Sequence, residues 1–256
     1  MPAHLLPHVL NWLSKTTGLE TGMENDGHLR AIAMRLRVPV DINARARGVG
    51  NALLNKAASD EEFCLDLVDV ALLFWGQRTS CASELENILT FAGSVWTVAS
   101  DRDRLQLAVD ESAQATYEAA VAPQDEASTQ LAEAWAKAFG RTIDPSDAWD
   151  HAIKAVEVVL IPVVCPNNSK ATLGSVIGIL AASQTGPSWK MVLPTGTLNY
   201  EVDSLVSMLR MIWPNPDRHG AAAPAHTPTK GEAQAVVSLA ATLVQWARQG
   251  WIVQQR

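Results

Sequence analysis

Apolar residues recur every three or four positions along most of this chain, and few folds are compatible with that spacing. Near the C-terminal end these residues are Ala233, Val236, Val237, Ala240, Leu243, Val244 and Ala247. Such spacing places them on one face of an α-helix, and that face has to be covered by other secondary-structure elements. The same spacing occurs in residues 6–13 and 149–163. The pattern therefore predicts a mainly α-helical protein.

The amino-acid composition agrees with a helical fold and leaves room for two domains. Of the 256 residues, 48% are hydrophobic, and apart from the tryptophans these are largely Ala, Val and Leu, which together favour helix over sheet. Residues 95–98 and 105–109 are rich in β-formers and flank the turn Asp101-Arg102-Asp103, which predicts a β-hairpin. The chain becomes Ala-rich after Asp110. We therefore expect a helical N-terminal domain, 1–110, with a hairpin near 95–109, and a second helical domain, 111–256.

Capping residues and prolines predict where individual helices begin and end. Ser59, with Glu62 three positions later, has the pattern of a capping box. Asp144 and Pro145 mark a second helix start, and Pro166 marks the end of that helix. Residues 189–193 are expected to form either a strand or a connection. Further helices are expected at residues 29–38, 43–57, 83–91, 111–139 with an interruption near Pro123, 170–182, 203–212 and 230–253.

The charge balance argues against a protein that coats nucleic acid over its whole surface. The net charge is −7 and the isoelectric point is near 5.3, so electrostatic attraction to phosphate has to be local. The most basic window holds six cationic residues against the single acid Asp41: Arg30, Arg35, Arg37, Arg45, Arg47 and Lys56. This window is either a solvated face compensated by the acidic run 60–62 or a contact surface for a partner.

Several classes of site are not indicated by the sequence. The three cysteines lie far apart without a CxxC pair, which argues against a disulfide framework or a zinc site. Phosphate-binding and dinucleotide-binding glycine motifs are absent. The apolar runs are too short for a membrane span, and no secretory signal is recognisable. We therefore expect a cytoplasmic protein that uses no metal or cofactor and does not enter a membrane.

A compact polar cluster lies between the helices expected at 203–212 and 230–253. Its sequence is WPNPDRHG, residues 213–220. Its two prolines cannot continue the preceding helix and Gly220 frees the backbone, so the cluster is expected to form a stiff loop. Loops held between packed helices often display polar chemistry. The alternative is a solvated turn in which Asn215 and Asp217 only satisfy backbone groups.

An imidazole beside a guanidinium is sufficient for RNA cleavage without a metal. His219 could exchange protons with the ribose 2′-hydroxyl or the leaving oxygen, and Arg218 or Arg210 could bind the phosphate. Asp217 or Asn215 could orient the imidazole. A single loop offers one histidine, so such a site is expected to be completed in a homodimer. The candidates for contacts with the rest of the substrate are Lys154, Lys170 and Asn167, and the alternative for the two lysines is a solvated helix surface.

Three stretches of the second half resemble a known family. The segment AWDHAIKAVE (148–157), the run PNNSKATLG (166–174) and the pair His219-Gly220 before an Ala-rich amphipathic helix resemble the abortive-infection C-terminal domains of the HEPN superfamily. The resemblance covers residues 144–253. It implies a helical bundle from bacterial antiviral defence, in many members a metal-independent ribonuclease that acts as a dimer, preceded by a variable helical domain.

One departure from the family pattern leaves two functions open. The family places an arginine with four to six residues between it and the histidine, and residues 212–214 occupy those positions here. Either Arg218 or Arg210 has taken over the arginine role, or the fold is retained without activity. In the second case Arg218 would pair with Glu157 or Asp150 and His219 would cap a helix. The protein would then be a scaffold that dimerises or binds a protein or RNA partner, with the basic window as its contact.

Overall fold

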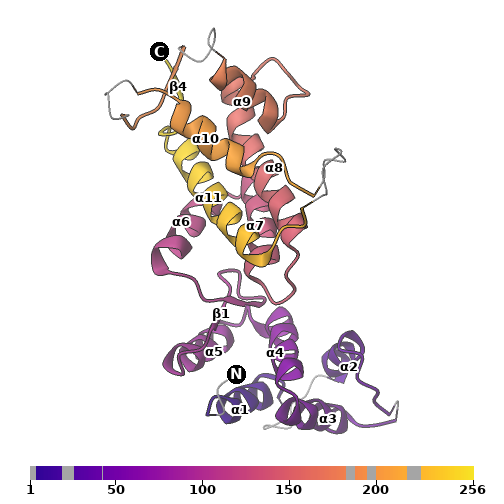
Figure 1. The fold of residues 1–256 in the computed structure, drawn as a ribbon. Coiled ribbons are helices and arrows are strands. Elements are labelled where there is room, and N and C mark those ends of the chain that lie inside the picture. Colours follow the sequence, from indigo (N-terminus) through magenta and orange to yellow (C-terminus); the bar gives the residue numbers. More distant parts are fainter. Residues whose placement is uncertain (1–3, 19–25, 42, 183–187, 195–199, 218–225) are drawn as a thin grey trace. The chain divides into compact units, whose positions relative to one another are not determined.

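The computed structural model describes residues 4–18, 26–41, 43–182, 188–194, 200–217 and 226–256. These residues form eleven α-helices and four short strands (Figure 1), which confirms the prediction of a mainly α fold. Contacts along the chain divide it into two compact units, Met1–Ala108 and Val109–Arg256. No helix of the described residues combines the length and the apolar character needed to cross a bilayer. The division into two independent domains stays a prediction.

The first unit packs five helices around its own apolar core (Figure 1). Trp12, Leu29, Leu53, Leu67 and Leu85 come from five different helices and are almost completely buried. The elements are α1 (Leu6–Thr16), α2 (Asp26–Arg35), α3 (Ala46–Ser59), α4 (Glu61–Trp75), α5 (Thr79–Phe91), β1 (Trp96–Val98) and β2 (Leu105–Leu107).

The predicted hairpin is present, and two helices hold it. Strands β1 and β2 are antiparallel, with Thr97 opposite Gln106. The carboxylate of Glu86, on α5, accepts hydrogen bonds from the Thr97 hydroxyl (2.6 Å) and the Val98 backbone N–H (2.7 Å). Asp69, on α4, accepts one from the Leu105 N–H (2.7 Å). An isolated three-residue pair would be marginal, so these carboxylates supply much of what fixes it.

The predicted capping box at Ser59 is wrong by one residue. Asp60 is the N-cap of α4, and its carboxylate accepts a hydrogen bond from the Phe63 N–H at 3.0 Å. Ser59 is the last residue of α3, and its hydroxyl donates to the Lys56 carbonyl. Asp and Ser are about equally good N-caps, and Asp60 takes the position because Ser59 still belongs to α3 and Asp60 is the one residue between the two helices.

The second unit places α8 at the centre of a helical bundle. Helix α8 contacts α7, α9, α10 and α11, and the core includes Leu131, Trp135, Leu160 and Val237. The elements are α6 (Glu111–Val121), α7 (Glu126–Phe139), α8 (Pro145–Val164), α9 (Leu173–Ala181), β3 (Trp189–Lys190), α10 (Asp203–Ile212), α11 (Lys230–Arg248) and β4 (Gln254–Gln255). Helices α8 and α10 begin at the residues expected from the sequence.

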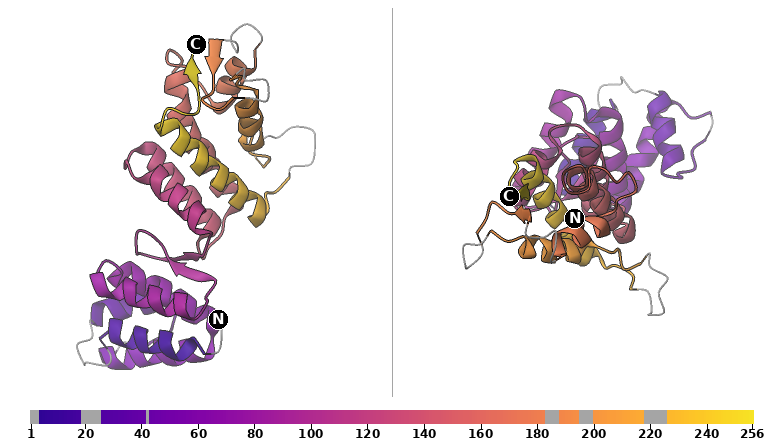
Figure 2. Two further views of the ribbon diagram at one scale, coloured as in Figure 1. Left: turned by 90° about the vertical axis from the view of Figure 1, so that its left-hand side faces the viewer. Right: turned by 90° about the horizontal axis from the view of Figure 1, so that it is seen from above.

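Two of the expected helix bounds in this unit are wrong. Helix α9 begins at Leu173, capped by Thr172, because residues 168–171 form a turn in which the Asn168 side chain accepts from the Lys170 N–H. Helix α11 ends at Arg248, and Gly250 then adopts a positive φ of 70° that redirects the chain. The chain continues into β4, which pairs antiparallel with β3 (Figure 2).

Candidate functional site

One face of α8 carries three polar residues, Asp150, Lys154 and Glu157, at steps of four and three. On a helix surface that faces water, these three charged side chains would all be exposed. Lys154 is indeed exposed. Asp150, however, is only 6% exposed and Glu157 is half-buried. Both carboxylates therefore face other parts of the unit, and only Lys154 faces water.

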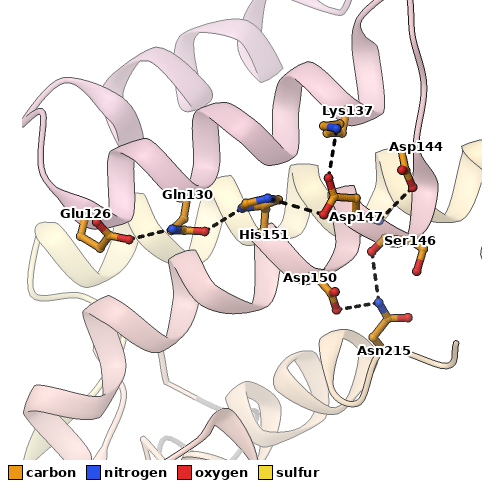
Figure 3. Close-up of polar contacts among 9 residues, drawn as sticks. All are labelled: Glu126, Gln130, Lys137, Asp144, Ser146, Asp147, Asp150, His151 and Asn215. Atoms are coloured by element: carbon orange, nitrogen blue, oxygen red, sulfur yellow. Dashed lines mark hydrogen bonds and ion pairs between the residues drawn. The ribbon is translucent and has the colours of Figure 1, made fainter. Parts of the chain in front are cut away.

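Asn215 attaches the loop after α10 to this face of α8 (Figure 3). Its side chain is 3% exposed, and its Nδ2 donates to Asp150 Oδ1 at 2.8 Å and to the Ser146 carbonyl at 3.1 Å. Its Oδ1 accepts from the Asp217 N–H at 3.1 Å. All three bonds hold the loop in place. The predicted role of Asn215 or Asp217 in orienting His219 stays a prediction, because His219 lies outside the described residues.

Two tryptophans fix the end of α10. The indole Nε1 of Trp149, on α8, donates to the Ile212 carbonyl at 2.6 Å. Trp213, the next residue, packs against α9 at Gly174, where an added Cβ would lie 2.9 Å from the Trp213 Nε1. Only a glycine at position 174 leaves room for this ring. The loop is thus held by α8 and α9 together.

A cleft of about 260 Å³ lies between α8, the start of α9 and the 213–215 segment. We call it the α8 cleft. Ile153 supplies part of its apolar wall. The polar and aromatic lining residues are Asp150, Lys154, Glu157, Thr172, Trp213 and Asn215.

Glu157 is held by the first turn of α9. Its Oε1 accepts a hydrogen bond from the Leu173 N–H at 2.6 Å. Burial raises the pKa of this carboxyl above its usual value, and the bond from Leu173 and the nearby charge of Lys154 offset part of that effect. The carboxyl is therefore fixed in orientation and is more readily protonated than a surface glutamate.

A second groove, of about 340 Å³, continues along the same helix. Lys154 and Glu157 line both spaces, and the additional residues are Glu126, Gln130, Val158, Ile161 and Pro162. The α8 cleft and this groove therefore share Lys154 and Glu157, and Val158, Ile161 and Pro162 give the groove an apolar wall.

A chain of polar contacts joins α7 to α8 beside this groove (Figure 3). Gln130 Nε2 donates to Glu126 Oε1 at 2.7 Å, and Gln130 Oε1 accepts from His151 Nδ1 at 2.7 Å. His151 Nε2 lies 3.6 Å from Asp147 Oδ1, and Lys137 Nζ lies 3.1 Å from Asp147 Oδ2. The hydrogen bond from Lys137 lowers the pKa of Asp147. These contacts account for His151 as a packing residue between two helices.

The structure brings only some of the predicted site residues together. Lys154 and Asn215 line the α8 cleft. Asp217 is exposed at the end of the described loop. Arg218 and His219 lie outside the described residues. Three others are exposed and do not line the cleft: Arg210 in the last turn of α10, and Asn167 and Lys170 in the turn between α8 and α9.

Sequence reasoning missed four of the polar and aromatic residues that line the cleft: Asp150, Glu157, Thr172 and Trp213. The seven-residue interval between the two carboxylates does place them on one face of α8. That interval does not say whether the face meets water or another helix. Among the described residues, no group of three His, Cys, Asp or Glu side chains is arranged to hold a metal ion.

In the first unit, most of the basic window is exposed. Arg35, Arg37, Arg45 and Arg47 are exposed and form no ion pair with any described residue. Arg30 differs, because its Nε lies 2.8 Å from Asp26 and its Nη2 donates to the Ala44 carbonyl at 2.6 Å. Four cationic side chains at the end of α2 and the start of α3 are thus available to an anionic partner.

No protein-family model matches the chain, and no curated protein and no solved structure is significantly similar to it. The resemblance to the HEPN superfamily therefore depends on the sequence motifs alone.

Proposed function

We propose that the Val109–Arg256 unit is a HEPN-like domain and that the protein is a bacterial antiviral or stress-defence effector that cleaves RNA without a metal. The observation that most supports this is the attachment of residues 213–217 to α8 through the buried Asn215 side chain. A catalytic group has to be held within a fraction of an ångström of its productive position. A loop fixed at its root by buried bonds meets the first requirement for such a site.

The proposed catalytic residues follow this fixed root directly. Arg218 and His219 come immediately after Asp217 in the sequence, and covalent geometry keeps the His219 Cα within about 15 Å of the Asn215 Cα. His219 acts as the general acid or base, and Arg218 binds the phosphate. Arg210 is the alternative phosphate ligand. The second histidine comes from another copy of the chain in a homodimer formed by this unit.

The experiment compares the purified protein with its His219→Ala variant on total cellular RNA in EDTA. Chelator-resistant cleavage that is lost in His219→Ala supports the proposal, and Arg218→Ala should then show a comparable loss. The matched control is His8→Ala, since His8 is an exposed histidine on α1. Equal cleavage by the protein and His219→Ala, or no cleavage by either, would end the catalytic proposal.

A non-catalytic scaffold is the second candidate, and the four exposed arginines of the basic window favour it. In this case the first unit docks RNA or an acidic protein through Arg35, Arg37, Arg45 and Arg47. Arg35→Glu/Arg37→Glu should weaken RNA binding and reduce the slope of log affinity against log salt by about 1.4, at about 0.7 per lost contact with single-stranded RNA. Arg78→Glu, at an exposed position before α5, is the control. An unchanged slope would mean that the basic window is a solvated face and does not contact RNA.

A further inference from the structure

We propose that the α8 cleft is a nucleobase subsite that accepts a base bearing an amino group, guanine in preference to the others. This inference deepens the proposed action on RNA and rests on it. It assigns the base to the cleft and the phosphate of the same nucleotide to Lys154 at the rim.

The charges of the cleft argue against a phosphate inside it. Asp150 is almost completely buried and Glu157 is half-buried, and both line the space. Among the residues that the structure describes, Lys154 is the only cation that lines the cleft, and it is exposed. Interactions between charges are stronger in a partly buried site than in water. Two carboxylates in the cleft therefore repel an anion more than one solvated ammonium attracts it. The ligand group that enters is therefore neutral and rich in hydrogen-bond donors.

The shape and the aromatic lining suit a flat ring. A volume of about 260 Å³ is slightly below the range of small-molecule sites, which span roughly 300–1,000 Å³, and it suits one base better than a whole nucleotide. The indole of Trp213 lines the cleft and is fixed against Gly174. Unpaired bases in RNA are commonly bound by stacking on such rings.

The fixed carboxyl of Glu157 selects among bases. The Leu173 N–H already donates to Oε1, but each carboxylate oxygen has two lone pairs, so both oxygens can still accept from a ligand. Guanine presents two adjacent donors, N1–H and the N2 amino group, which match the two oxygens of one carboxylate. Adenine and cytosine present one amino group on the corresponding edge. Uracil presents carbonyl oxygens on either side of its single N–H, and a carboxylate repels them.

Lys154 is placed to complete the contact with the same nucleotide. It lies one turn from both Asp150 and Glu157 on α8, is exposed, and lines both the α8 cleft and the adjoining groove. An ammonium at this rim can meet a phosphate attached to the bound nucleoside while the base occupies the cleft. Glu157 would then recognise the base, and Lys154 would bind the phosphate.

The test is calorimetric titration of the full chain with GMP, AMP, CMP and UMP. In the unmodified protein GMP should bind at least about tenfold more tightly than UMP, and this ranking needs no variant. Glu157→Gln keeps an acceptor for the Leu173 N–H and should bring the affinity for GMP down to that for UMP. Lys154→Ala should weaken all four monophosphates by a similar factor and leave guanosine unaffected. Glu133→Gln, at an exposed glutamate of α7, is the control.

The outcomes separate this inference from the proposed ribonuclease. Equal affinity for GMP and UMP, no binding of any nucleotide at millimolar concentration, or unchanged GMP affinity in Glu157→Gln would overturn the subsite. Selective GMP binding by a protein that fails to cleave RNA would leave the subsite standing and end the ribonuclease proposal. RNA cleavage by a protein that binds the four nucleotides equally would support the ribonuclease proposal and end the subsite.

Discussion

Replacing Asn215 by alanine should destabilise the second unit by about 3 kcal/mol. The change removes one hydrogen bond to a carboxylate, worth about 1.5–3 kcal/mol, and one to a backbone carbonyl, worth about 1 kcal/mol. The third bond, from the N–H of the exposed Asp217, is left out of this sum because water can replace the lost acceptor. Both bonds lie in a region from which water is nearly excluded, since Asn215 is 3% exposed. The Asp150 carboxylate would lose its amide donor while it stays buried, which is the costlier part of the change.

Differential scanning calorimetry of the full chain measures this effect. For a unit of this size, 1 kcal/mol shifts the melting temperature by about 2–4 °C, so the expected decrease is about 6–12 °C. The control is Asn167→Ala, because Asn167 is exposed in the turn after α8 and should change stability by less than about 0.5 kcal/mol. A decrease no larger than that of the control would refute the reasoning, since the loop would then be held by something other than this side chain.

Three further predictions concern packing, pH and reactivity. Gly174→Ala should destabilise the protein by about 1–3 kcal/mol because the added Cβ would meet the Trp213 ring. Gly178→Ala, where the added Cβ has open space around it, should stabilise α9 by up to about 1 kcal/mol. Urea denaturation measures both changes in stability, and equal changes would contradict the packing argument. The pKa of Glu232 is lowered to about 2, mainly by the hydrogen bond from the N–H of Thr229, the N-cap residue of α11. The stabilising contribution of this carboxylate is therefore present above pH 4.5 and is lost as the pH falls towards 2. The stability difference between the protein and Glu232→Gln should shrink over that interval, and a constant difference would contradict this prediction. Burial raises the pKa of the Cys64 thiol to about 11, so iodoacetamide at pH 8 should modify Cys64 only after denaturation, as followed by mass spectrometry.

Much of the secondary structure was predictable because its causes are local. Helix α10 spans the residues expected from apolar spacing and prolines, and β1 and β2 lie inside the expected hairpin. The errors occur where two local signals compete or where the cause is distant. Ser59 and Asp60 are both good caps, and only the geometry of the chain decides between them. Strand β4 forms because it pairs with β3. Each of these segments is only two residues long, so neither shows a periodic pattern in the sequence.

The candidate site was less predictable than the helices for the same physical reason. Asn215 was identified as a polar loop residue, but its partner Asp150 is 65 positions away in the sequence. Periodicity places Asp150 and Glu157 on one side of α8 and apolar residues on the other. Whether that polar side meets water depends on where α9 and the loop after α10 pack. The burial of the two carboxylates therefore follows only from tertiary structure.

The central position of α8 has a consequence for genetics. One side of this helix supplies Ala152, Ala155 and Val156 to the interior, and the other side supplies Asp150, Lys154 and Glu157 to the cleft. In a loss-of-function screen, hits on the first side should lower the amount of protein in the cell, because they damage packing. Hits at Lys154 or Glu157 should leave the abundance near normal. A screen that records abundance together with phenotype would therefore divide substitutions along a single helix into those that lower the amount of protein and those that do not.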